Sequence, residues 1–119
     1  MGKQLAAGIF SLVLATSPVQ AQSFEGMSDC GDWLQARQNK TSVALEHFAL
    51  GTLNGIAIGR YTEFWRADGR EISRAAVYFS IDQYCRIHPT DHLGLAITSL
   101  FEQRTGRTAH PPVTERPRP

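Results

Sequence analysis

The longest apolar stretch of the chain has the period of an α-helix, and this feature constrains the fold most strongly. In the segment 41–60, apolar side chains form a broad face, and Glu46, His47 and Asn54 lie opposite. A helix that is apolar nearly all round is usually the central, buried one. No segment alternates apolar and polar residues over more than a few positions, as a half-buried strand does. We therefore expect an all-α fold built around this helix.

Further helices are expected on both sides of this segment. The ranges 28–38 and 90–104 begin with residues that can cap helices, and these two ranges and 73–87 carry apolar residues at helical spacing. The range 73–87 stops before Pro89, because a proline disfavours helical geometry at the residue before it. A short helix is also expected within 61–72. The sequence thus predicts a compact domain of four to five helices.

The N-terminus has the layout of a secretory signal peptide. Lys3 precedes an apolar run, and the small residues Val19 and Ala21 precede a cleavage site that we place after Ala21. The run is shorter than the ~20 residues that a membrane span needs. We therefore expect residues 1–21 to be removed, and the mature protein to be periplasmic or secreted and without a membrane span.

Two cysteines, Cys30 and Cys85, remain in the mature chain. An even number of cysteines in a small exported protein predicts a disulfide. The helical domain expected over 22–103 has room for only a modest core, so a covalent link would support it. Closing a loop of this length is worth ~4 kcal/mol by chain-entropy arguments. Cys85 is expected on the inner face of its helix, and Asp82 on the solvent side.

The charge composition gives no strong electrostatic field. The chain has 12 Lys and Arg against 11 Asp and Glu, and removal of Lys3 with the signal peptide makes the two numbers equal. This balance argues against nucleic acid as a partner. The range 104–119 is basic, rich in proline and poor in apolar residues. We expect it to be a disordered tail.

Three glycines, Gly51, Gly55 and Gly59, follow one another at four-residue spacing in the segment 41–60. Each glycine in a helix interior costs about 1 kcal/mol relative to alanine. A stripe without side chains lets another helix approach its backbone closely. The expected neighbour is a helix of the same domain. A second subunit, which would make the stripe a dimer seam, and a partner peptide in an open groove are the alternatives.

No group of residues predicts catalysis, a metal site or a cofactor. His88 and His92 are separated by Pro89, so they do not share the face that two histidines use in a helical metal site. Ser80 and Ser99 lack the glycine-flanked turn that activates a nucleophile. We expect the protein not to be an enzyme.

An aromatic and basic cluster follows the glycine segment, formed by Tyr61, Phe64, Trp65 and Arg66. Tryptophan and arginine are enriched at the energetic centres of protein interfaces. A tryptophan in so small a domain is more often part of the core. The cluster is therefore a candidate partner surface, with burial as the alternative.

Three stretches resemble a group of small exported bacterial helical proteins. They are "CGDWLQARQ", which begins at Cys30, "FALGTLNGIAIG", and "IDQYCRIHPTDHLGLAITSL", which contains Cys85. These proteins share a cysteine near the mature N-terminus, a helix with a Gly-x-x-x-Gly pattern, a Tyr-Cys pair followed by a proline, and an amphipathic last helix. Two families have this arrangement: the HdeA-type periplasmic acid-stress chaperones, and the type VI secretion immunity proteins that bind and block cell-wall amidase toxins. The resemblance covers about 30–101, and its most specific part is "DQYCRIHP".

The two families imply different activities. Resemblance to the chaperones implies one disulfide between helices and a homodimer that dissociates in acid, exposing apolar surface to unfolding clients. Resemblance to the immunity proteins implies a folded inhibitor with a preformed surface for one toxin. Both imply a non-catalytic module that binds other proteins in the bacterial envelope. The single cysteine pair favours the chaperone type, and an accessory protein of an envelope or secretion assembly is a third hypothesis.

Overall fold

A computed structural model describes residues 26–110 of the chain. Both the expected signal peptide, 1–21, and the end of the expected tail, 111–119, lie outside the described residues. Within 26–110 the structure has no β-strand, and its helices are α1 (Cys30–Gln38), α2 (Val43–Gly59), the short 3-10 helix η1 (Ala67–Gly69), α3 (Arg74–Ile87) and α4 (Leu93–Thr105). The all-α prediction is confirmed.

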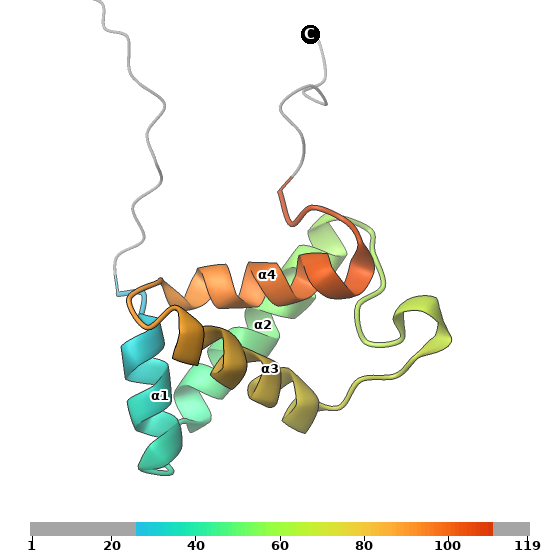
Figure 1. The fold of residues 1–119 in the computed structure, drawn as a ribbon. Coiled ribbons are helices and arrows are strands. Elements are labelled where there is room, and N and C mark those ends of the chain that lie inside the picture. The colour runs from blue at the N-terminus through green and yellow to red at the C-terminus, as the bar shows by residue number, and fades with distance from the viewer. Residues whose placement is uncertain (1–25, 111–119) are drawn as a thin grey trace, which may run out of the picture.

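The four α-helices form one compact group from which a single loop extends. α1 packs on α3, α3 on α4, and α4 on α2, which passes behind the other helices in Figure 1. The loop 60–73, which contains η1, connects α2 to α3 and projects from one end of the molecule. α4 contacts all three other α-helices and each of those contacts only one or two, so part of every helix stays exposed.

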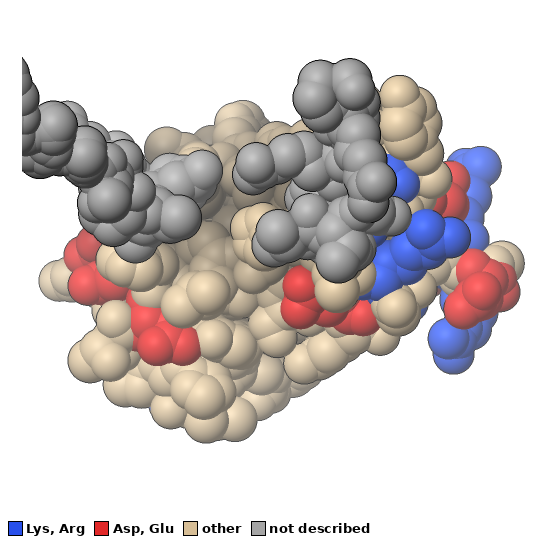
Figure 2. All heavy atoms as spheres, turned by 90° about the horizontal axis from the view of Figure 1, so that it is seen from above, with Lys and Arg blue, Asp and Glu red and all other residues tan. Residues whose placement is uncertain are grey.

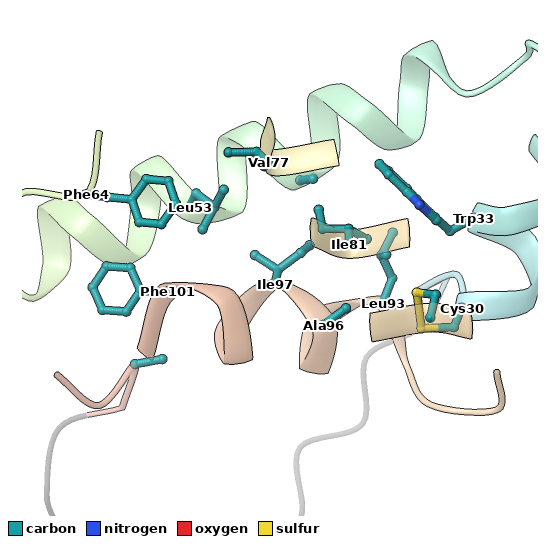
Figure 3. Close-up of a cluster of buried hydrophobic side chains, with 13 residues drawn as sticks. Cys30, Trp33, Leu53, Phe64, Val77, Ile81, Leu93, Ala96, Ile97 and Phe101 are labelled. Atoms are coloured by element: carbon teal, nitrogen blue, oxygen red, sulfur yellow. A yellow bond between two sulfur atoms is a disulfide. The ribbon is translucent and has the colours of Figure 1, made fainter. Parts of the chain in front are cut away.

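The core contains fully buried side chains from all four helices and from the loop (Figure 3). Trp33, Leu53, Ile81 and Phe101 come from α1, α2, α3 and α4, and Phe64 comes from the loop. The rings of Phe64 and Phe101 stack with their centroids 6.0 Å apart. Through Phe64, the loop takes part in the same hydrophobic core as the helices.

The disulfide between Cys30 and Cys85 is confirmed, and it joins the first residue of α1 to the last turn of α3. Two backbone hydrogen bonds also join the residues at the start of α1 to the residues at the start of α4. The amide of Cys30 donates to the carbonyl of Asp91 at 2.8 Å, and the amide of Leu93 donates to the carbonyl of Ser28 at 3.0 Å. The start of α1 is thus held against both α3 and the start of α4.

α2 is less buried than its sequence predicts. Only Ala49 and Leu53 are buried, whereas Phe48 is 39% exposed and Ile58 is 75% exposed. The reason is that α4 is the only α-helix that packs extensively on α2. An apolar helix is central only if neighbours surround it, and this chain has too few helices to do so.

The expected boundary between residues 103 and 104 falls inside α4, which continues to Thr105. Gly106 ends the helix with a left-handed conformation, φ 69°. Beyond it, Ala109 is 8% exposed and joins the core, and its amide donates to the carboxylate of Glu102 at 2.8 Å. The helical domain therefore extends to residue 110, because this short segment folds back on α4 and α2.

Candidate protein-binding surface

The glycine stripe of α2 lies on the surface. Gly51, Gly55 and Gly59 are exposed, and a Cβ added at each would meet no described atom within 4 Å. The expected close contact with another helix of the same domain is therefore wrong for the described residues. Gly55 and Gly59 instead line an open hollow of about 500 Å³. The dimer seam and the open groove remain as hypotheses.

The exposed side of α2 is mainly apolar, in addition to having no side chains at its three glycines. Val43, Phe48 and Ile58 are 61%, 39% and 75% exposed. The only Asp, Glu, Lys or Arg of α2 is Glu46, whose carboxylate contacts the guanidinium of Arg37 at 3.4 Å. We call this surface, formed by Val43, Ala44, His47, Phe48, Gly51, Gly55, Ile58 and Gly59, the α2 face.

Tyr61 stands just beyond the C-terminus of α2. Its side chain is 97% exposed, and its φ of 50° is left-handed. A bulky residue in this conformation costs about 1 kcal/mol or more relative to glycine. Because the side chain makes no packing contribution in return, Tyr61 fits a role in binding better than one in folding. The structure thus keeps it on the predicted partner surface.

The other aromatic residues of the predicted partner surface have different positions. Phe64 is fully buried, so its assignment to the surface is wrong. Trp65 is half-buried, packs edge-on against Phe64 with centroids 5.2 Å apart, and donates from its indole nitrogen to Asn54 Oδ1 at 2.8 Å. Arg66 is exposed and forms an ion pair with Glu71 at 3.4 Å. One face of Trp65 is therefore core and the other is accessible.

Arg104 of α4 fixes the loop that carries these residues. Its guanidinium donates to the carbonyls of Phe64 at 2.5 Å and Trp65 at 3.0 Å, and also to the carbonyl of Arg70. It also lies over the Phe64 ring, 5.5 Å from the centroid. Charge-assisted hydrogen bonds of this kind are among the stronger polar contacts in proteins. The loop is thus held in a defined conformation although it contains little helix.

A groove separates the loop from the start of α3. It has a volume of about 760 Å³, and Trp65, Arg66, Ile72 and Arg74 are among its lining residues. A second hollow of about 320 Å³ is lined by Leu50, Asn54, Trp65 and Arg74. Trp65 and Arg74 belong to both, so the two hollows adjoin. We call them together the Trp65 groove.

Sequence reasoning missed two residues of the Trp65 groove. Asn54 orients the indole of Trp65, and its position opposite the apolar face of its helix was the only signal. Arg74 is the first residue of α3 and follows the N-cap Ser73. A cation in the first turn of a helix opposes the helix dipole. Because the helix was expected to begin at about residue 73, this unfavourable position of Arg74 was a signal available in the sequence.

Asp82 is also misplaced by the sequence pattern, because it is buried at 7% exposure rather than on the solvent side. It accepts hydrogen bonds from Trp33 Nε1 at 2.7 Å and from Arg37 Nε and Nη2, both at 3.0 Å. The carboxylate raises the pKa of Arg37 above its ordinary value by hydrogen bonding. A charged residue at a helical core position is buried only with such partners. Here the partners belong to α1, which is about 45 residues earlier in the sequence.

Tyr84, His88 and Asp91, which lie near Pro89, form a structural contact. Tyr84 donates from its hydroxyl to Asp91 Oδ2 at 2.6 Å, which raises the pKa of Tyr84 to about 12. His88 Nδ1 lies 3.9 Å from the same oxygen. In the part of the chain that is described, no three His, Cys, Asp or Glu side chains are grouped to hold a metal ion.

Comparison with profiles of known protein families, with characterised proteins and with solved structures finds no match to this chain. Among residues 26–110, no helix has the length and apolar character needed to cross a membrane.

Proposed function

We propose that the protein is a non-catalytic protein-binding module of the bacterial envelope, of the HdeA-type acid-stress chaperone kind. The observation that supports this proposal is the α2 face, which is mainly apolar, contains no Asp, Glu, Lys or Arg, and is open. Contiguous exposed apolar surface on a small protein commonly marks a site of interaction with another protein. Apolar segments of unfolding proteins are the partners that such a surface suits.

The energetics of the α2 face favour binding over folding. The two glycines in the interior of α2, Gly51 and Gly55, cost about 2 kcal/mol relative to alanines, and no described side chain packs in the space they leave. Exposed Ile58 and Phe48 add no burial to the fold. Features that weaken a fold without a compensating contact are expected at functional sites. The disulfide offsets part of this cost for the domain as a whole.

Acid would act through the carboxylates that join the helices. The carboxylate of Asp82 pairs with the guanidinium of Arg37 at 3.0 Å, and the carboxylate of Asp91 accepts from the hydroxyl of Tyr84 at 2.6 Å. Both contacts hold α3, and the disulfide keeps α1 attached to it when they weaken. We propose that the helices separate partly in acid and extend the apolar surface that begins on the α2 face.

The test is suppression of client aggregation by the oxidised mature protein, followed by light scattering at pH 2 to 3 and at pH 7. Ile58→Lys should abolish protection, because it puts a charge in the α2 face. The matched control is Ile87→Lys on α3, since Ile87 is 73% exposed and Ile58 is 75% exposed. Protection confined to acid and lost only in Ile58→Lys is the expected result. Equal loss in both variants would contradict the role of the α2 face.

A second candidate function is that of an immunity protein for a cell-wall amidase toxin, or of an accessory protein in an envelope assembly. The preformed Trp65 groove favours this candidate, because Arg104 holds it in one conformation before any partner binds. Absence of client protection at both pH values, together with a stoichiometric complex with one purified envelope protein, would replace the chaperone proposal by this one.

A further inference from the structure

The Trp65 groove combines an accessible aromatic surface with a cation that lacks a partner. Trp65 is held from behind by Phe64 and from the side by Asn54, so its remaining face is turned to the groove. Leu50 and Ile72 add apolar lining on either side of it. The groove therefore offers a defined contact for one apolar side chain of a ligand.

Among the Arg and Glu side chains that line the groove, Arg74 alone makes no hydrogen bond or ion pair within residues 26–110. Glu63 accepts hydrogen bonds from the backbone amide of Trp65 at 3.0 Å and of Arg66 at 3.4 Å, and Arg66 pairs with Glu71 at 3.4 Å. The charges of these three side chains are therefore engaged locally. The guanidinium of Arg74 remains for an anion from outside, and its exposure makes it accessible.

The position of Arg74 carries a cost for the fold. It stands at the first position of α3, and the first turn of that helix contains no acidic residue. A positive charge there opposes the helix dipole by about 0.3–1 kcal/mol. An anion bound beside Arg74 would offset both the charge and the dipole.

The surface around the groove carries charges of both signs, with a small excess of positive charge. Its residues 60–74 contain Arg60, Arg66, Arg70 and Arg74 against Glu63, Asp68 and Glu71. Figure 2 shows Lys and Arg gathered at the end of the molecule where the loop 60–73 projects, with Asp and Glu among them as well as at the opposite end. The small positive excess favours a partner segment that carries negative charge.

We propose that the Trp65 groove binds an acidic segment of a partner protein, with one carboxylate at Arg74 and an adjacent apolar side chain on Trp65. This assignment rests on the proposed protein-binding function and names the chemistry of the partner. Charge argues against the chain's own residues 111–119 as the occupant, because they contain Arg116 and Arg118 against a single Glu115. Anionic lipid is also disfavoured, since membrane recruitment uses clusters of four to eight basic residues.

The experiment uses the two tryptophans of the mature protein as reporters. The oxidised, ¹⁵N-labelled chain is titrated at pH 7 with the blocked peptide acetyl-Glu-Leu-Phe-Glu-Leu-amide, and the indole N–H resonances are followed by NMR. The expected result is a saturable shift of the Trp65 resonance and none of Trp33, which is buried and bonded to Asp82. The same peptide with glutamine in place of glutamate should shift Trp65 at least fivefold less at equal concentration.

Substitution of Arg74 separates binding from folding. Arg74→Gln should raise the dissociation constant of the acidic peptide at least about fivefold, as expected for an interface residue worth more than 1 kcal/mol. Its urea midpoint should stay the same or rise, because the unfavourable charge at the start of α3 is gone. Arg86→Gln is the matched control, since Arg86 is an exposed arginine in the last turn of the same helix. Its peptide affinity should equal that of the wild type.

Three results would overturn the assignment. They are an unshifted Trp65 resonance, equal shifts with the glutamate and glutamine peptides, and equal weakening by Arg74→Gln and Arg86→Gln. A shift caused by vesicles of phosphatidylglycerol but not by the peptide would identify a lipid surface instead. If client protection persists while the peptide fails to bind, only the groove assignment falls. If both fail, the chaperone proposal falls with it.

Discussion

Trp33 donates from its indole nitrogen to the carboxylate of Asp82 across 2.7 Å in the interior of the domain. This hydrogen bond lies in the middle of an antiparallel seam between α1 and α3. One helical turn to one side is the Cys30–Cys85 disulfide, and one turn to the other side Arg37 lies over the ring of Tyr78, 5.6 Å from its centroid. Covalent, polar and cation–π contacts thus follow one another along the same two helices.

The Asp82 carboxylate should be the most sensitive polar group of this seam. Asp82→Ala leaves the indole of Trp33 and the guanidinium of Arg37 without their acceptor, so we expect a loss of about 3 kcal/mol in the free energy of unfolding. Urea denaturation at pH 7 measures it. Glu46→Gln is the control, because Glu46 contacts the same guanidinium at a longer 3.4 Å, and it should cost less than about 1 kcal/mol. Equal costs would show that burial of Asp82 is not what matters.

The disulfide should contribute more to stability than any single side chain. It closes a separation of 55 residues, for which chain-entropy arguments give ~4 kcal/mol. Reduction, or the double change of Cys30→Ser and Cys85→Ser, should lower the urea midpoint accordingly or unfold the domain. Thiol titration of the unreduced, denatured chain should find no thiol, and two thiols would contradict the bridge.

The Tyr84–Asp91 contact predicts a stability change at alkaline pH. Hydrogen bonding to Asp91 raises the pKa of the Tyr84 phenol from 10.0 to about 12 in the folded protein. Because the folded state favours the protonated phenol, the contribution of Tyr84 is complete below pH 10 and is lost as pH rises toward 12. Tyr84→Phe should therefore cost about 1 kcal/mol at pH 7, and the difference from the wild type should shrink above pH 10.

Absorbance at 295 nm checks the same assignment directly. Titration of the folded wild type should show one phenol that ionises near pH 12, and Tyr84→Phe should remove this step. The control is Tyr61→Phe, which changes a 97% exposed side chain and should leave the step in place. A titration without a late step would show that Asp91 does not accept this hydrogen bond in solution.

The open space at Gly55 predicts opposite effects on folding and on binding. Gly55→Ala should stabilise the monomeric fold by up to about 1 kcal/mol, because alanine favours the helix and meets no atom within 4 Å. Gly55→Leu should leave the urea midpoint nearly unchanged but reduce client binding or dimerisation, since it fills the α2 face. Sedimentation measures dimerisation, and client protection measures client binding. A fold destabilised by Gly55→Leu would mean that the stripe packs inside the domain after all.

The sequence predicts the local features of this fold well and the long-range ones poorly. Caps, the break before Pro89 and helical periodicity place all four helices within a few residues of their true bounds, and the even cysteine number predicts the bridge. The side of each helix that packs against the core was harder to predict. Apolar residues occur nearly all round α2, so the pattern does not show which side of the helix packs on α4. For this reason the glycine stripe was expected in the interior, although it is exposed.

The candidate site shows the same limit. Tyr61 and Trp65 were expected at a partner surface and are accessible, whereas Phe64 between them is core, because a loop has no period from which to assign sides. Asp82 is buried because Trp33 and Arg37, about 45 residues away, supply its hydrogen bonds. Arg104 looked like part of a basic tail, but three backbone carbonyls of the loop hold it. Such pairings depend on the tertiary fold and leave no local signal.

The hydrogen bonds that join Ser28 and Cys30 to Leu93 and Asp91 have a consequence for the order in which the chain can fold. The ribosome makes α1 first and its own Asp29–Asp32 cap can form at once, yet the tertiary partners of its beginning, Cys85, Asp91 and Leu93, lie more than 50 residues later in the sequence. α1 must therefore wait, without these tertiary contacts, until α3 and the start of α4 have been made. A fragment that ends before Cys85 should lack all of these contacts, and folding should be a single cooperative event of nearly the whole domain.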